Sequence, residues 1–156
     1  MVDTNIIVDV LQPDPAHGRA SARRLRKALQ SYALLVPPFV YCELMAAGRS
    51  AGLLADFFVR ARLGLERDIP LEVYDVAAQR YQQYLSVRRQ GDDVVQCPGC
   101  GATQHPTCSK CARSLSSRKM PFDFLIGAFA VVAGDRHTLT RDPGTYQRYF
   151  PDLILV

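Results

Sequence analysis

The first eleven residues, MVDTNIIVDVL (residues 1–11), decide how the chain begins its fold. Met1 and Val2 are apolar, and the three residues that follow, DTN (3–5), suit a turn and a helix cap. The apolar run after them continues as a helix. The stretch therefore predicts a short strand that breaks directly into a helix, with the carboxylate of Asp3 at the junction.

Strand-like and helix-like segments then alternate along the chain. The predicted strands are ALLVP (33–37), IPLEVYD (69–75), HTLTRD (137–142) and DLILV (152–156). The predicted helices are HGRASARRLRKALQ (17–30), PFVYCELMAAG (38–48), AGLLADFFVRARLGL (51–65), DVAAQRYQQYLSVRRQ (75–90) and PFDFLIGAFAVVAG (121–134), with TYQRYF (145–150) as a short helix or turn. In the fourth of these helices, Ala78, Tyr81 and Leu85 have the spacing of core residues. The alternation predicts an α/β domain with a parallel sheet.

Composition places the chain among globular proteins. Its 156 residues are the length of one ordinary domain, and 48% of them are hydrophobic and 22% charged. No apolar run approaches the ~18–20 residues that cross a bilayer, and the N-terminus lacks the pattern of a signal peptide. We therefore expect a cytoplasmic protein without a membrane segment. The net charge of +4 is compatible with a polyanionic partner.

Residues 92–119 interrupt the alternation with a segment that has almost no apolar side chains. It contains CPGCGATQHPTCSKC (97–111), two Cys-x-x-Cys pairs formed by Cys97, Cys100, Cys108 and Cys111. Four thiolates fill a tetrahedral zinc shell and leave no open position, so this zinc would be structural and would help to fold the insertion. The alternatives are a shell in which His105 replaces one thiol, a redox dithiol, and an iron site. Cys42 lies in an apolar helical stretch and is expected to be buried.

Four acids fall where the carboxyl ends of parallel strands and the adjoining helices line a cleft. Asp3 closes the first strand, and Glu43 lies within the helix after the second. Asp123 is in the first turn of the helix after the insertion, and Asp142 ends HTLTRD. Carboxylates that gather in apolar surroundings repel one another, and a hard divalent cation would neutralise them. Magnesium and manganese bind such oxygen ligands. The set suits metal-assisted hydrolysis of a phosphodiester, with the metal activating the attacking water.

Structural roles compete with this interpretation. Each of the four acids is alternatively a cap or an ion-pair partner, and for Asp123 a helix-start role is the natural alternative. The other acids near element ends are expected to be surface, cap or turn residues: Asp9, Asp14, Asp75 and Asp135. The three histidines are scattered, which disfavours catalysis by a serine or cysteine nucleophile.

Four motifs in order resemble one family. DTN (3–5), YCEL (41–44), DFLIGAFA (123–130) and LTRDPGTYQRYFPDL (139–153) resemble the PIN-domain endoribonucleases, and most closely the VapC toxins of prokaryotic toxin–antitoxin pairs. The resemblance covers nearly the whole chain except about residues 92–119. It implies a three-layer α/β/α fold with a central parallel sheet, and it places the family's acidic quartet on Asp3, Glu43, Asp123 and Asp142. Thr140 falls where the family often has a hydroxyl beside the last acid, and Asn5 where a polar side chain supports the first.

The resemblance further implies an Mg2+- or Mn2+-dependent endoribonuclease that cuts single-stranded RNA, forms a homodimer and is blocked by a VapB-type antitoxin. Residues 1–156 would form one PIN domain, with 92–119 as an inserted zinc ribbon. Two features depart from the family pattern: only two residues precede Asp3, and the cysteine insertion is extra.

Two other functions compete with the toxin. One is a PIN nuclease for maturation of ribosomal or other RNA, and the other is an inactive module that only binds nucleic acid. Arg113, Arg118 and Lys119 flank the cysteine loop and are candidate RNA contacts. The insertion alternatively gives structural support, or contacts a dimer mate or the antitoxin.

Overall fold

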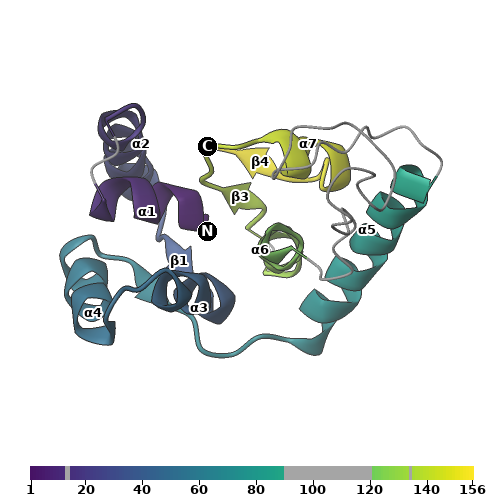
Figure 1. The fold of residues 1–156 in the computed structure, drawn as a ribbon, viewed down its shortest axis with the longest axis horizontal. Coiled ribbons are helices and arrows are strands. Elements are labelled where there is room, and N and C mark those ends of the chain that lie inside the picture. The colour runs from purple at the N-terminus through teal and green to yellow at the C-terminus, as the bar shows by residue number, and fades with distance from the viewer. Residues whose placement is uncertain (13–14, 90–120, 134) are drawn as a thin grey trace, which may run out of the picture.

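The computed structural model describes residues 1–12, 15–89, 121–133 and 135–156 (Figure 1). Its helices are α1 (Thr4–Leu11), α2 (Gly18–Ser31), α3 (Pro38–Ala46), α4 (Ala51–Arg60), α5 (Leu71–Arg89), α6 (Phe122–Val132) and α7 (Gly144–Tyr149). Its strands are β1 (Leu35–Val36), β2 (Gly64–Leu65), β3 (His137–Thr138) and β4 (Ile154–Leu155). The chain alternates between the two kinds of element, so the predicted α/β class is confirmed.

The strands are short and parallel, and the N-terminus joins them. β1 pairs with β2, and β3 pairs with β4. Between the two pairs, the Val2 N–H donates to the Leu35 carbonyl at 3.0 Å, and the Asp3 N–H donates to the Leu139 carbonyl at 2.9 Å. The order across the molecule is therefore β2, β1, residues 1–3, β3, β4. Figure 1 shows α1 and α2 on one side of this line, and α5 and α6 on the other.

The core forms where these helices close over the strands. α6 is apolar on nearly all sides, and Phe124, Ile126 and Phe129 are among its buried side chains. Such a helix is stable only when it is surrounded by other elements. Its Gly127 approaches the end of α7 so closely that an added Cβ would lie 2.7 Å from ring carbons of Phe150. Glycine is therefore required here by space rather than by backbone conformation.

The structure corrects the expected strand at residues 69–75. α5 already begins at Leu71, and the strand that pairs with β1 is Gly64–Leu65. Val73, Ala77 and Tyr81 are buried at a spacing of four residues, which is the period of a helix face. Ala78, which was expected in the core, is exposed.

Two single residues also differ from expectation. Cys42 is exposed, because it lies on the outer side of α3 while Val40 and Leu44 face the core. Asp9 is only 4% exposed, so it is not a surface residue. Its Oδ2 accepts a hydrogen bond from the Ser21 hydroxyl at 2.7 Å and lies 3.3 Å from the Arg141 guanidinium. Asp75 and Asp135 are exposed, as expected.

Several predictions from the sequence lie outside the described residues. They are the zinc site at Cys97, Cys100, Cys108 and Cys111, the bounds of the insertion at 92–119, the surface role of Asp14, and the RNA contacts Arg113, Arg118 and Lys119. No helix in the described part of the chain is both long and apolar enough to cross a membrane.

Candidate active site

Asp3 follows Val2, whose parallel bridge to Leu139 lies between the two strand pairs, and it stands where the chain turns into α1. It occupies the N-cap position without capping the helix through its side chain, and it is 3% exposed. Instead, its Oδ2 accepts hydrogen bonds from the Thr140 hydroxyl at 2.6 Å, the Asn5 side-chain amide at 2.8 Å and the Tyr146 hydroxyl at 3.2 Å. Burial raises the pKa of Asp3, while hydrogen bonds from the Thr140 and Tyr146 hydroxyls and from the backbone N–H groups of Asn5 and Thr4 oppose the rise.

Thr140 and Asn5 connect Asp3 to the loop after β3. The Thr140 oxygen accepts from the Asn5 amide and from the Asp142 backbone N–H, each at 3.1 Å. The side-chain oxygen Oδ1 of Asn5 accepts a hydrogen bond from the Arg141 backbone N–H at 3.1 Å. The structure thus places both polar residues beside Asp3, at the positions that the sequence indicated. Their hydrogen bonds fix the loop that carries Asp142 against the start of α1.

Glu43 reaches the same region from the middle of α3. The Thr4 hydroxyl donates a hydrogen bond to Glu43 Oε2, which ties α3 to the first turn of α1. Burial raises the pKa of Glu43, and the negative charge of Asp3 raises it further, while the Thr4 hydrogen bond lowers it. Glu43 is therefore a partly buried carboxylate whose described partner is a hydroxyl, not a cation.

Asp123 enters the site from the first turn of α6. Its pKa is raised to about 6, first by burial and then by the charges of Asp3, Glu43 and Asp142. Because all three acids act on this one carboxyl group, the quartet predicted from the sequence is brought together by the fold. Asp142 stands in the turn before α7, where its Oδ1 accepts from the Gly144 N–H at 3.1 Å.

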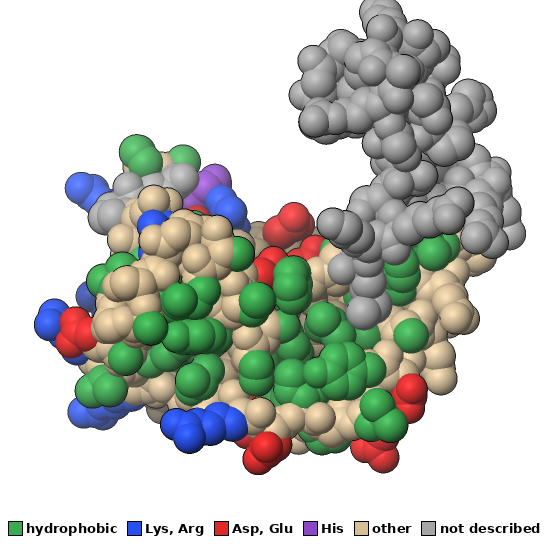
Figure 2. All heavy atoms as spheres, turned by 60° about the horizontal axis from the view of Figure 1, so that its bottom comes forward, with side chains coloured by type: hydrophobic (Ala, Val, Ile, Leu, Met, Phe, Trp, Pro, Cys, Tyr) green, Lys and Arg blue, Asp and Glu red, His purple; other side chains and the backbone are tan. Residues whose placement is uncertain are grey.

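The site carries an excess of negative charge. None of the four acids forms an ion pair with a lysine, arginine or histidine of the described residues. Figure 2 shows red acidic side chains gathered at the upper centre of one face of the molecule. The donors are carboxylate oxygens, which is the chemistry that hard divalent cations select.

The four carboxylates do not form a closed metal cage. Among the described residues, no group of three or more His, Cys, Asp or Glu side chains is arranged as a metal-binding cluster. This looser arrangement fits Mg2+, which is usually held by one or two carboxylates and keeps several waters. The donor set therefore fits such a cation by its chemistry and its charge.

Two contributors to the site were not predicted as such. Thr4 was assigned to the turn and cap, but it binds Glu43. Tyr146 was placed in a short helix or turn, yet its buried hydroxyl donates to Asp3, and burial followed by the charge of Asp3 raises its pKa. The only sequence signal for either residue was its place within the DTN and TYQRYF motifs. Their partners come from distant parts of the chain.

A family model of the PIN domain matches residues 1–150. The chain therefore belongs to the PIN-domain family, whose members are in general metal-dependent nucleases that typically use divalent ions such as Mg2+. No curated protein and no solved structure matches the chain. The acidic site formed by Asp3, Glu43, Asp123 and Asp142 is thus the candidate nuclease centre.

Proposed function

We propose that the protein is an endoribonuclease that hydrolyses RNA phosphodiester bonds with Mg2+ or Mn2+ bound by Asp3, Glu43, Asp123 and Asp142. One observation carries the proposal: burial, and then the charges of three acids from distant segments (Asp3, Glu43 and Asp142), raise the pKa of Asp123, and none of the four acids forms an ion pair with a described cation. Carboxylates that repel one another in this way destabilise the fold unless a bound cation offsets the repulsion.

The side chains of the chain hold the acids ready for the cation. Thr140, Asn5 and Tyr146 fix Asp3, and Thr4 fixes Glu43. Asp123 accepts no hydrogen bond from the described residues, so it is the acid whose protonation changes most easily near neutral pH. A divalent cation, when bound, lowers the pKa of a water molecule and stabilises charge on the phosphate. The protein's part is to orient the carboxylates and to hold them close together for the cation.

The biological role that we propose is that of a toxin in a toxin–antitoxin pair, inhibited by a VapB-type antitoxin. The support is the resemblance of DTN, YCEL, DFLIGAFA and LTRDPGTYQRYFPDL to the VapC toxins, together with the effect that the acids of the other three motifs have on the pKa of Asp123. Maturation of ribosomal or other RNA is the alternative function. The wild-type chain and the Asp3→Asn variant would be induced in cells, and new RNA 5′ ends mapped.

Growth arrest together with discrete new 5′ ends, both lost in Asp3→Asn, is the expected result for a toxin. Cleavage confined to precursor RNA without growth arrest would support the maturation enzyme instead. No new 5′ ends with the wild-type chain would contradict both roles.

A homodimer fits the surface of the described residues. Large hydrophobic side chains are exposed on α3, α4, β2 and α5: Met45, Leu53, Val59, Leu65, Leu71 and Tyr74. Figure 2 shows that hydrophobic side chains cover much of the lower part of the face on which the acids lie. Large apolar side chains exposed on neighbouring elements are typical of an interaction surface. We propose that a second copy of the chain covers it.

We propose a structural zinc ion bound by Cys97, Cys100, Cys108 and Cys111, on the basis of their spacing. Metal analysis of the purified chain is expected to find about one zinc per chain, because four thiolates complete a tetrahedral shell. The paired change Cys108→Ser and Cys111→Ser should remove it. A purified chain that contains no zinc would contradict the assignment.

A further inference from the structure

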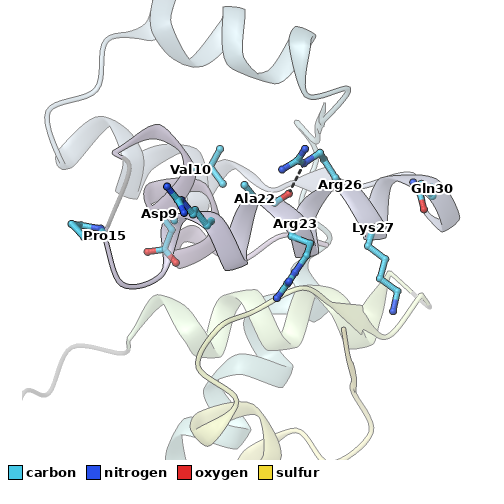
Figure 3. A pocket seen from close by; sticks show the side chains of 10 residues that line it. Asp9, Val10, Pro15, Ala22, Arg23, Arg26, Lys27 and Gln30 are labelled. Carbon is cyan, nitrogen blue, oxygen red and sulfur yellow. Dashed lines mark hydrogen bonds between the residues drawn. The ribbon is translucent and has the colours of Figure 1, made fainter.

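An open hollow of about 1020 Å³ lies between α1 and α2, apart from the four acids. We call it the α2 groove. One wall is formed by α1 at Asp9 and Val10, and the other by the side of α2 that carries Arg19, Arg23, Arg26 and Lys27. Figure 3 shows Arg23 and Lys27, one turn apart, extending from α2 in the same direction. The four cations span about 12 Å along the helix, at 1.5 Å per residue.

The positive charge of the α2 groove is not neutralised within the described structure. None of the four cations forms an ion pair with a described acid, and all four side chains are exposed. Arg26 donates only to the Ala22 carbonyl of its own helix, at 3.3 Å. The one acid in the described lining, Asp9, is bound by Ser21 and Arg141. Four exposed cations on one helix wall therefore present a strip of uncompensated positive charge.

The α2 groove is linked to the acidic site through Asp9. Arg141, which forms the ion pair with Asp9, immediately precedes Asp142. The backbone N–H of Arg141 donates to Asn5, which also contacts Asp3. The ion pair between Asp9 and Arg141 thus connects the end of the groove to the loop that carries Asp142. A ligand lying in the groove would approach the acidic site from this end.

We infer that the α2 groove binds the phosphate backbone of the RNA strand on one side of the scissile bond. A stacked strand places a phosphate about every 3.4 Å along its axis, so 12 Å matches about three to four phosphates. The described lining contains no aromatic side chain on which a base could stack. The groove therefore contributes affinity and orientation, and not the choice of cut sequence.

An acidic protein segment fits the groove less well than RNA. Helical partners bind through apolar anchors, and the described apolar lining is limited to small or short side chains such as Val10, Pro15 and Ala22. Regularly repeated charge on the groove wall suits a polymer with regularly repeated charge. This inference rests on the proposed ribonuclease function, because it names the path of that substrate.

The test uses the full chain carrying Asp123→Asn, so that RNA is bound without being cut. Binding of a fluorescein-labelled oligouridylate of about 12 nucleotides is measured by anisotropy over a series of salt concentrations. The test variant adds Arg23→Gln and Lys27→Gln. The matched control adds Arg60→Gln and Arg67→Gln, which remove the same charge from exposed positions outside the groove. Circular dichroism verifies that both variants fold.

The groove variant is expected to bind the RNA about tenfold more weakly than its parent near 0.1 M salt. The plot of log binding constant against log salt concentration should also become less steep by about 1.4, because each of the two lost phosphate contacts contributes about 0.7 to the slope. The control should keep the slope of the parent. Equal affinities and slopes for the two double variants would overturn the inference. Tighter binding of an oligoglutamate than of RNA, lost in the groove variant, would overturn it in favour of an acidic protein segment.

Cleavage by chains that retain Asp123 separates this inference from the proposed function. The groove variant should show a raised KM, an unchanged kcat and unchanged cut positions, because its phosphate contacts lie away from the reacting bond. If the wild-type chain cleaves RNA and the groove variant keeps its KM, the groove inference is wrong and the ribonuclease stands. If no chain cleaves RNA but binding still depends on Arg23 and Lys27, the ribonuclease proposal fails and the RNA-binding groove stands.

Discussion

At the scale of single residues, the pKa of Asp123 reflects the charges of the other three acids in the site. The pKa of its carboxyl group is raised from 3.8 to about 6, so the folded chain binds a proton more tightly than the unfolded chain does. Between those two values the folded state holds more protons, and the free energy of unfolding decreases as the pH rises through that range. Above pH 6 the full electrostatic cost remains unless a cation binds. The repulsion among the acids therefore lowers the stability of the fold at neutral pH.

The Asp123→Asn variant is expected to be more stable than the wild type in the absence of metal at pH 7, and to lose RNA cleavage. Removing one charge relieves the repulsion from Asp3, Glu43 and Asp142. Melting temperatures are measured with EDTA and with Mg2+, at pH 5 and pH 7. The exposed Asp75→Asn serves as the control and should change neither property. A variant that melts below the wild type in EDTA at pH 7 would refute the repulsion argument.

The pH dependence of cleavage follows from the same carboxyl group. At subsaturating Mg2+, activity should rise as the pH increases through about 6, since Asp123 must lose its proton to bind the cation. At saturating Mg2+, the midpoint should move to lower pH, because the cation competes with the proton. Initial rates at several Mg2+ concentrations measure this shift. A midpoint that is independent of Mg2+ would separate Asp123 from metal binding.

Thr140 is expected to position Asp3 through its hydroxyl group. Thr140→Val removes the donor to Asp3 and leaves the Asn5 amide and the Asp142 N–H without this acceptor, at a cost of about 1–3 kcal/mol of stability. Metal affinity should fall about 10- to 100-fold, as for other groups that support metal ligands. Thr140→Ser retains the hydroxyl and should restore both properties. Metal titration by calorimetry measures the affinity, and equal affinities for the two variants would exclude a positioning role.

At the scale of elements, α6 packs closely against the end of α7 at Gly127. Gly127→Ala places a Cβ 2.7 Å from ring carbons of Phe150, so the change should destabilise the fold by about 1–3 kcal/mol through overpacking. Gly52→Ala on α4 has no atom within 4 Å of the new Cβ and should be neutral or slightly stabilising. Chemical denaturation of both variants measures the difference. If Gly127→Ala is as stable as Gly52→Ala, the contact is less tight than the structure indicates.

Helices were easier to predict from the sequence than strands. α2 was found because its apolar and polar residues are distributed with a helical period, and α6 because a long apolar run follows Pro121. β2 is only two residues long and both are exposed, so no alternating pattern marks it. The start of α5 was taken for a strand because IPLEVYD is rich in apolar residues, although Val73 and Ala77 have helical spacing.

The acids of the candidate site could be predicted from the sequence, but the residues that hold them could be predicted only in part. The positions of Asp3, Glu43, Asp123 and Asp142 followed from the ends of strands and from the family motifs, because both are local features of the sequence. The contacts of Thr4 with Glu43 and of Tyr146 with Asp3 were not predictable, since they join segments 39 and 143 residues apart. Asp9 was expected at the surface, in a cap or in a turn, but it is buried. Its partners, Ser21 and Arg141, lie in other parts of the chain, so the sequence did not indicate its burial.

At the scale of the whole molecule, the exposed apolar area on α3–α5 predicts self-association. Val59 is 79% exposed on α4, so its replacement does not disturb the core. Val59→Glu combined with Leu53→Glu should shift the wild-type dimer towards monomer in light scattering after size-exclusion chromatography. Asp56→Lys, in the same helix, should leave the dimer intact if apolar contacts dominate. A wild-type chain that is monomeric at high concentration would contradict the dimer.

The acids, the α2 groove and the apolar face occupy different parts of one small domain. Together they support our proposal of a chain that would bind a polyanion on a basic helix and cut it at a carboxylate-bound cation. The main part of this proposal is the hydrolysis of RNA at the four acids.

That claim is tested most directly by incubating a single-stranded RNA of defined sequence with the purified chain and Mg2+ or Mn2+. We expect internal cuts that require the cation, stop on addition of EDTA, and are absent from Asp3→Asn and Asp123→Asn. Cleavage that persists in EDTA or in both variants would contradict it.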